Sequence, residues 1–220
     1  MRLNRDYAFQ DYIVGDNNKG VVEAISSAMT IPGQIHNPLF IYGSVGVGKT
    51  HLLQVLAHEY TPGLKIYYAT IEKFINNITQ AIQNHRYINF IEHCLDFDVL
   101  LIDDIHLIKD RKSTLEEMLH IFERLYKARK QIVLSADKPP QEIFNTKDKA
   151  YRIFQKGLIL KIHPPGYRDR LKFLQAKAEN AGLSLTRSSL KSMAQRTNPD
   201  FRELEGILAK TKLRYELTQG

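Results

Sequence analysis

The sequence predicts an α/β protein in which a parallel five-stranded sheet lies between helices and a small C-terminal three-helix lid follows. Two observations predict this fold. Five short apolar segments alternate with helical patterns over the first 163 residues, and this alternation is typical of a parallel sheet. Beyond residue 166 the pattern is only helical. We therefore expect a nucleotide-binding α/β part over residues 1–163 and a helical lid over 164–220.

Five apolar segments are the expected strands. In chain order they cover residues 39–42, 65–69, 97–104, 131–135 and 158–162. The third is apolar on both faces, which indicates a strand covered by helices on both sides of the sheet. Residues 163–166, His-Pro-Pro-Gly, then read as a hinge because helix formation is disfavoured before proline.

The segments between these strands have helical spacing. Leu52, Leu53 and Leu56 share one helix face after the first strand. Apolar residues recur every four positions over 71–84, and another helix is expected over 85–95. Three helix starts are marked by polar residues: the run 16–18, a capping box that opens at Thr114, and Asp200 ahead of the last helix.

Composition narrows the class of protein. With 43% hydrophobic and 25% charged residues, the chain has the balance of a soluble globular protein. No run of about 18 apolar residues occurs, so we expect no membrane-spanning segment. The single cysteine, Cys94, excludes an internal disulfide, agrees with a reducing cytoplasm and is expected to be a packing residue.

Positive charge is concentrated near the C-terminus. The net charge is +7, and residues 167–220 contain 11 Lys and Arg against 6 Asp and Glu. This balance is compatible with a nucleotide or nucleic-acid partner. For any single charge, an ordinary solvated helix surface is the simpler explanation.

Residues 43–50, Gly-Ser-Val-Gly-Val-Gly-Lys-Thr, match the phosphate-binding loop without a mismatch. Glycines allow the backbone to bend around a phosphate, and the exposed N–H groups then bind anionic oxygens. Lys49 would place a charge at the β and γ phosphates, and Thr50 would offer its hydroxyl to Mg²⁺. The alternative, a glycine-rich turn with no ligand, does not explain the full match between a strand and a helix.

Asp103 and Asp104 end the third expected strand. Ligands of α/β sheets bind beside the carboxyl ends of the strands. Asp103 is therefore placed to hold Mg²⁺ through water, and Asp104 to orient an attacking water. The alternative is a pair of acids that only caps the following segment.

Five motifs in this order resemble the AAA+ core of the bacterial replication initiator family DnaA. They are residues 37–43 (NPLFIYG), 48–52 (GKTHL), 100–105 (LLIDDI), 135–140 (SADKPP) and 202–206 (RELEG). The resemblance covers nearly the whole chain, and the combination is more specific than the phosphate loop alone. It implies a P-loop AAA+ fold with a three-helix lid, ATP or ADP as ligand, and Mg²⁺.

The resemblance also implies roles for individual residues. Asp103 and Asp104 match the Walker B acids, Asp137 matches sensor 1, and Arg202 matches sensor 2, a lid arginine that reports ATP against ADP. The alternative for Arg202 is a surface helix residue. The residues that match the family's adenine-holding N-terminal box are Tyr7, Phe9, Val14, Gly15 and Asn18. The residues that match its phosphate-loop segment are Gly43, Gly46, Val47, Gly48, Lys49, Thr50 and His51.

The chain departs from the family at the arginine finger. The finger position aligns with Ile153, and the arginine stands one place earlier, at Arg152. One residue on a helix turns a side chain by about 100°, since a turn takes 3.6 residues. Sensing of a neighbour's ATP through Arg152 therefore requires that the segment be rewound.

The second departure lies in the single-strand DNA grip. The matching positions are Ile78, Thr79, Arg111, Ser113 and Thr114. Thr79 replaces a valine and Ser113 an arginine, so a phosphate-tracking groove would lose one cation. We expect weakened DNA binding here, while an ordinary basic loop over 109–112 explains the charges equally well.

We expect the core of a DnaA-type initiator, with slow ATP hydrolysis as the reset of a switch. Its implied partners are origin DNA, further copies of itself, and the replicative helicase or its loader, in the cytoplasm at the nucleoid. Duplex origin boxes would be read by a domain absent here. The alternative is a short adaptor or helicase loader that regulates initiation through protein contacts. A metabolic P-loop kinase explains neither the lid nor Arg202.

Overall fold

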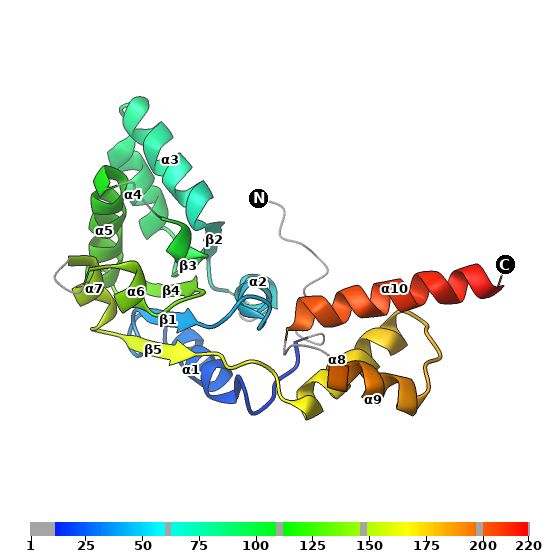
Figure 1. Ribbon diagram of the computed structural model, residues 1–220. Coiled ribbons are helices and arrows are strands. Elements are labelled where there is room, and N and C mark those ends of the chain that lie inside the picture. The colour runs from blue at the N-terminus through cyan, green and yellow to red at the C-terminus, as the bar shows by residue number, and fades with distance from the viewer. Residues whose placement is uncertain (1–11, 60–62, 109–111, 146–148, 197–199, 220) are drawn as a thin grey trace.

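A computed structural model describes residues 12–59, 63–108, 112–145, 149–196 and 200–219 (Figure 1). The predictions for Tyr7, Phe9 and Arg111 lie outside the described residues, as does the prediction for the side chain of Ser113.

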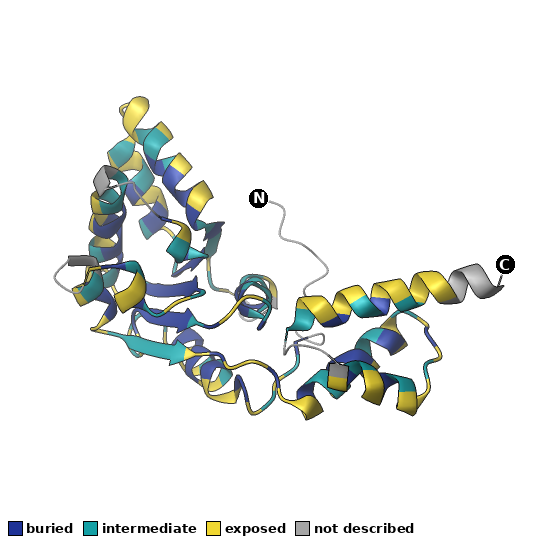
Figure 2. Ribbon diagram, in the orientation of Figure 1, coloured by how far each residue is buried: buried dark blue, intermediate teal, exposed yellow. Residues whose placement is uncertain are grey.

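Five parallel strands form one sheet, as predicted. They are β1 (Leu39–Tyr42), β2 (Ile66–Thr70), β3 (Val99–Asp103), β4 (Gln131–Ala136) and β5 (Leu158–Lys161). Their order is β2-β3-β4-β1-β5, and Leu39 of β1 lies opposite Val133 on one side and Leu158 on the other. The three central strands are almost wholly buried (Figure 2), as expected for a sheet that helices cover on both faces.

Two helical layers cover the sheet. The helices of this part are α1 (Lys19–Thr30), α2 (Lys49–Glu59), α3 (Ile71–Gln83), α4 (Tyr87–Leu95), η2 (Ile105–Leu107), α5 (Lys112–Lys127), α6 (Pro140–Ile143) and α7 (Lys149–Phe154). Side chains alternate along each strand. Leu39 and Ile41 therefore pack with α1 and α2, while Phe40 packs with α3, α5 and α7.

The last three helices form a separate group beyond β5 (Figure 1). They are α8 (Tyr167–Asn180), α9 (Arg187–Arg196) and α10 (Phe201–Gln219), and they share an apolar cluster built around Leu174, Ala194 and Leu204. Asn17 ties the connecting segment to the start of α1, because its side-chain amide and its carbonyl bond the backbone of His163 at 3.0 and 3.1 Å. The exact division at 163/164 stays a prediction.

Some helix starts differ from the prediction. Helix α5 begins at Lys112, so Thr114 lies inside its first turn and does not open it as a capping box. Helix α4 begins at Tyr87, because His85 has φ +54° and this left-handed conformation cannot join a helix. Asn18 precedes α1, but its side chain makes no capping bond. Asp200 does cap α10, and its Oδ1 accepts the Arg202 N–H at 2.8 Å.

Cys94 is buried, as the sequence predicts. Cys94 is 1% exposed, and burial raises the pKa of its thiol to about 12, which confirms a packing residue. Among the described helices, none has the length and apolar character needed to cross a membrane.

Candidate nucleotide-binding site

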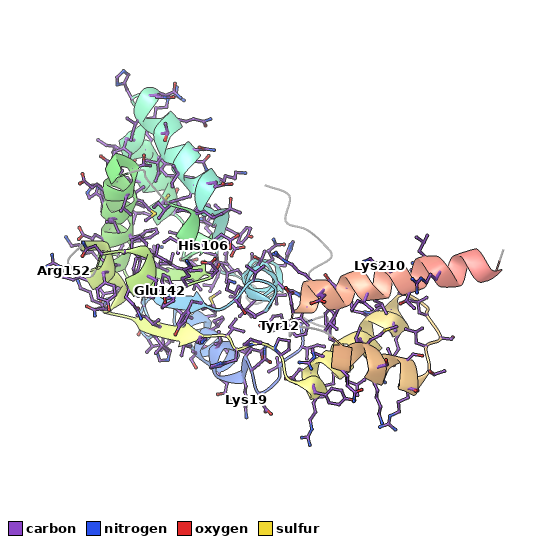
Figure 3. All side chains as sticks on the ribbon, viewed as in Figure 1. Tyr12, Lys19, His106, Glu142, Arg152 and Lys210 are labelled. Atoms are coloured by element: carbon purple, nitrogen blue, oxygen red, sulfur yellow. The ribbon has the colours of Figure 1, made fainter. Side chains whose placement is uncertain are left out.

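A cavity of about 290 Å³ lies where the α/β part meets the lid. Its floor is the phosphate loop and the segments that follow β3 and β4, and its roof is formed by α8 and α10. In Figure 3, Tyr12 and His106 lie in this central region, and both line the cavity. The site therefore sits at the carboxyl ends of the parallel strands, where α/β sheets hold their ligands.

The phosphate loop has the backbone that an anion cradle needs. Gly46 and Gly48 have φ of +78° and +99°, a region that side chains rarely tolerate. The Gly43 N–H donates to the Ala136 carbonyl at 3.2 Å and fixes the loop to β4. Lys49 Nζ folds back onto the loop and donates to the Gly43 carbonyl at 2.7 Å and the Ser44 carbonyl at 3.0 Å. Those carbonyls hold the ammonium beside the cavity.

Most of the predicted loop residues line the cavity. They are Gly46, Gly48, Lys49, Thr50 and His51. Val47 does not, because its side chain is fully buried beneath the loop, and Gly43 is packed closely against the Ile162 carbonyl. These two residues shape the loop rather than face a ligand.

The two strand-end carboxylates face different surroundings. Asp103 is 1% exposed and accepts hydrogen bonds from the Ser135 hydroxyl and, at 3.1 Å, from the Tyr68 hydroxyl. Asp104 lines the cavity from a left-handed backbone, φ +57°, and its N–H donates to Ser135 Oγ at 3.1 Å. The left-handed turn separates the neighbours, so that Asp104 reaches the cavity and Asp103 stays behind it.

Burial and neighbouring charges shift two pKa values in this site. Burial raises the pKa of Asp104, and the nearby Asp103 carboxylate raises it further. Burial lowers the pKa of Lys49, while Asp104 and the other carboxylates of the site oppose that change. A carboxylate with a raised pKa holds a proton more readily and is the better candidate for a general base.

Both predicted sensor residues reach the cavity. Asp137 lines it from the end of β4 and Arg202 from the first turn of α10. The lid also contacts the phosphate loop directly, because the Phe201 N–H donates to the Gly46 carbonyl at 3.0 Å. The structure thus brings together the loop, both strand ends and the lid arginine, which lie far apart in the sequence.

The predicted N-terminal box acts indirectly in the part that the structure describes. Val14, Gly15 and Asn18 do not line the cavity. Asn18 is 1% exposed and donates to the Tyr12 hydroxyl at 3.2 Å and the Ile13 carbonyl at 2.9 Å. Because Tyr12 and Ile13 do line the cavity, Asn18 positions two of the residues that line it.

Seven lining residues are not among the site residues predicted from the sequence. They are Tyr12, Ile13, Val45, His106, Phe173, Phe201 and Glu205. The aromatic alternation near the N-terminus could have singled out Tyr12. The two lid phenylalanines, with ring centroids 4.7 Å apart, look like core residues until the lid is placed over the loop. With Tyr12 and Ile13 they give the cavity an apolar end, which suits a base rather than phosphates.

The residues present fit a Mg²⁺ ion that arrives with a triphosphate. The described residues contain no cluster of three or more His, Cys, Asp or Glu that could hold a metal alone. Mg²⁺ at phosphates needs only one or two protein ligands. Thr50 lines the cavity, and Asp103 lies behind with both oxygens engaged, so Thr50 suits direct contact and Asp103 contact through water.

The finger and DNA predictions fall outside this cavity. Arg152 is exposed at the outer edge of the α/β part (Figure 3), whereas Ile153 is 4% exposed and belongs to the core beneath α7. Ile78 is fully buried in the same core, and its contact with DNA stays a prediction. Thr79 and Thr114 are half-buried, and the Thr79 hydroxyl donates to the Ile75 carbonyl at 3.0 Å.

Known proteins match both the sequence and the fold. The family described as the bacterial DnaA ATPase domain matches residues 3–161. The chromosomal replication initiator protein DnaA of Thermus thermophilus is 40% identical over 210 residues, which cover 94% of this chain and 48% of that protein. The chain thus spans about half the length of the curated relatives it matches.

Solved structures agree. Domain III of the Thermotoga maritima replication initiation protein DnaA superposes with a TM-score of 0.88 at 33% identity, covering all of this chain and 92% of that one. A replication initiator DnaA bound to AMPPCP and single-stranded DNA superposes with a TM-score of 0.86 at 30% identity, covering 97% of this chain and 66% of that one. The chain therefore belongs to the bacterial DnaA ATPase domain family.

Proposed function

We propose that this chain is the ATP-binding and slowly hydrolysing AAA+ core of a DnaA replication initiator. Its ATP state controls self-assembly on origin DNA and DNA unwinding. The observation that carries the proposal is the meeting of the phosphate loop with the lid. The start of α10 bonds the Gly46 carbonyl and places Arg202 in the same cavity as Lys49.

Nucleotide binding follows from this arrangement. The apolar end of the cavity, with Tyr12, Phe173 and Phe201, takes the adenine of ATP or ADP. The loop N–H groups and the start of α2 take the phosphates. Lys49 exchanges its loop carbonyls for phosphate oxygens, and Thr50 and Asp103 would hold Mg²⁺, which would neutralise phosphate charge.

The lid reports which nucleotide is bound. Arg202 lies in the first turn of α10, on the part of the lid that touches the loop. A terminal phosphate attracts its guanidinium, and loss of that phosphate removes the attraction. The two nucleotides therefore favour different lid positions, which is an ordered switch.

Hydrolysis resets the switch. Asp104 faces the cavity, and its raised pKa suits it to accept a proton from the attacking water. Asp137, on the neighbouring strand end, is placed to orient that water or the terminal phosphate. Asp103 keeps the segment in place through Ser135, whose hydroxyl accepts the Asp104 N–H.

DNA and protein partners complete the proposal. A family member whose structure matches this chain is bound to AMPPCP and single-stranded DNA. Here the exposed parts of Thr79 and Thr114, together with Arg111 and Ser113, are the proposed DNA contacts. Further copies of the chain and the replicative helicase or its loader are the proposed protein partners, at the nucleoid.

A second candidate is an adaptor or helicase loader that binds nucleotide but does not self-assemble. The observation that favours it is the burial of Ile153, where the family's arginine finger aligns, beside an exposed Arg152. A buried isoleucine cannot reach a neighbour's phosphate. Arg152, which is exposed on the same helix, could supply a cation in its place.

Calorimetric titration with ATP tests the nucleotide site. Lys49→Ala removes the loop cation and should weaken ATP binding at least about a hundredfold, since a charged hydrogen bond contributes about 1.5–3 kcal/mol and several are lost. Lys161→Ala, an exposed change at the end of β5, is the control and should bind ATP normally. Equal affinity in the Lys49 variant and the unaltered protein would remove the proposed site.

Light scattering on the same protein samples distinguishes the initiator-core proposal from the adaptor alternative. The core should grow larger assemblies with ATP than with ADP, and Arg152→Ala should reduce them without changing ATP affinity. If the protein remains one size in both nucleotides while binding ATP tightly, the adaptor is the correct function.

A further inference from the structure

His106 is a cavity residue to which no motif gives a role. It lies on the short helix η2 that follows the strand-end carboxylates, and its side chain is 18% exposed. It lines the cavity together with Asp104 and Asp137, opposite the lid arginine Arg202. The ring therefore stands among the groups that meet the terminal phosphate in the proposed function.

One hydrogen bond selects the tautomer of the His106 ring. The backbone N–H of Asp137 donates to His106 Nδ1 at 3.3 Å. A ring nitrogen that accepts a hydrogen bond carries no proton, so the neutral imidazole holds its proton on Nε2. Nδ1 is occupied by the protein, and Nε2 is the nitrogen left to serve a ligand as a donor.

The Asp137 carboxylate does not use this ring as a hydrogen-bond partner. Its Oδ1 lies 3.5 Å from His106 Nδ1, beyond the usual length of such a bond. Oδ1 is also buried with no hydrogen-bond partner among the described residues. A buried carboxylate oxygen requires a donor, and a water brought in with the triphosphate would supply it. Ring and carboxylate are thus left with one free donor and one free acceptor.

The charges of the site explain why a donor is needed here. A triphosphate enters a cavity that already holds the carboxylates of Asp104 and Asp137. Like charges repel unless a donor or cation stands between them. Lys49 reaches from the loop and Arg202 from the lid, whereas His106 is the donor that comes from the same side as the two carboxylates.

We propose that His106 recognises the terminal phosphate of ATP: its Nδ1 anchors the ring to the Asp137 backbone, and its Nε2–H donates to the γ-phosphate. The proposal rests on the proposed ATP site. It adds a residue on the α/β wall that distinguishes ATP from ADP, independently of Arg202 on the lid. Because the ring is bonded to the segment that carries Asp137, the same contact aligns Asp137 with the reacting phosphate.

Two substitutions of His106 test the roles of its two ring nitrogens separately. In His106→Asn the amide oxygen can still accept the Asp137 N–H, but no donor extends to the Nε2 position. In His106→Gln the longer side chain carries an N–H donor to that position. Calorimetric titration should show ATP binding about tenfold weaker in His106→Asn, with ADP binding unchanged, because one charged hydrogen bond is lost. His106→Gln should restore ATP binding to within about twofold of the unaltered protein.

The outcomes decide between recognition and mere packing. The proposal is overturned if ATP and ADP binding weaken together, if His106→Asn binds ATP normally, or if His106→Gln fails to restore binding. Thermal unfolding of each variant confirms that it folds. A failure of the unaltered protein to bind ATP would instead overturn the proposed function, so the two failures are distinguishable.

A measurement on the unaltered protein covers the case in which the variants do not fold. Histidine labelled with ¹⁵N reports the ring nitrogens by nuclear magnetic resonance. A hydrogen-bonded Nε2–H proton of His106 should appear with a non-hydrolysable ATP analogue and be missing with ADP. The same spectrum in both nucleotides would overturn the proposal.

Discussion

The two walls of the nucleotide cavity are held in place in different ways. On the α/β wall, Asp103 is buried between the hydroxyls of Ser135 and Tyr68, and the Gly43 N–H ties the loop to β4. On the lid wall, the described hydrogen bonds to the loop reduce to the one from the Phe201 N–H to the Gly46 carbonyl. One wall is part of a buried network, and the other rests on a surface contact.

This difference matches the division of labour in the proposed switch. Catalysis requires that Asp104 and Asp137 stay within hydrogen-bond reach of the reacting atoms, and a buried network supplies that precision. Sensing requires that Arg202 change position when a phosphate is lost, which a wall held by few bonds can do at low cost. The lid has its own apolar cluster and can therefore move as a unit.

The largest expected effect comes from a substitution that removes the buried hydrogen bonds of Asp103 on the α/β wall. Asp103→Ala leaves the Ser135 and Tyr68 hydroxyls without their acceptor in a buried place. Each unsatisfied group costs about 1–3 kcal/mol, so unfolding free energy should fall by roughly 2–4 kcal/mol. Asp200→Ala on the lid wall removes a helix cap and should cost only about 1 kcal/mol. Urea unfolding followed by circular dichroism measures both.

Asp98→Ala is the control for that comparison. Asp98 lies just ahead of β3, is partly exposed and pairs with Lys130 at 3.3 Å. A partly exposed ion pair contributes about 0–1 kcal/mol. If the losses for Asp103 and Asp200 are equal, the two walls are equally firm and the contrast drawn between them is wrong.

The next largest expected effect comes from a substitution at Gly46, where the phosphate loop contacts the lid. Gly46 has φ +78°, and a Cβ there would collide with the Asp200 carboxylate. Gly46→Ala therefore costs about 1–2 kcal/mol in backbone strain and also pushes the lid away. ATP affinity should fall about tenfold or more, and dyes placed on α2 and α10 should report a longer distance by energy transfer.

Gly48→Ala is matched to this variant. Gly48 also has a positive φ, +99°, but its Cβ would approach the Tyr12 ring at 3.4 Å and not the lid. ATP affinity should fall in both variants, while the distance between α2 and α10 should change only in Gly46→Ala. A lid that moves equally in both variants would mean that the Gly46 contact does not hold it.

Local sequence patterns predict some parts of the fold and of the site, and contacts between distant segments decide the others. The strands, the phosphate loop and the Walker B acids are local patterns, and β1 was predicted residue for residue at 39–42. Lys49, Thr50, Asp104, Asp137 and Arg202, which were singled out from the sequence, all line one cavity. The strand predictions succeed because apolar runs act within a few residues along the chain, whereas Asp137 and Arg202 were singled out only by the family resemblance.

What the sequence misses depends on packing between distant segments. Phe173 and Phe201 line the cavity only because the lid lies over the loop. Asn18 is a different case: it looks like a helix cap, but its side chain bonds Tyr12 and Ile13, which lie only six and five residues earlier in the chain. Ile78 occupies a DNA-contacting position in the resemblance, yet its helical spacing with Phe74 assigns it to the core.

The smallest expected effect is a pH-dependent change in stability that distinguishes Asp104 from its buried neighbour Asp103. Burial raises the pKa of Asp104, so the ionised carboxylate is less favourable in the folded protein than in the unfolded chain. Its contribution to stability is therefore full below the unfolded pKa of about 3.9 and is lost as pH rises through the higher folded value. Asp104→Asn cannot ionise and tolerates the left-handed backbone.

The stability of Asp104→Asn relative to the unaltered protein should therefore increase from pH 4 to pH 7. The increase should stay below about 1 kcal/mol, because Asp104 is only partly buried and solvent screens it. Urea unfolding at both pH values measures the difference.

Asp103→Asn is the matched variant. The two hydrogen bonds of this carboxylate require two acceptor oxygens, so Asp103→Asn should be destabilised at pH 7. A stability difference for Asp104→Asn that shrinks with pH would mean that ionisation of Asp104 stabilises the fold, and its role as a base held ready by burial would then be untenable.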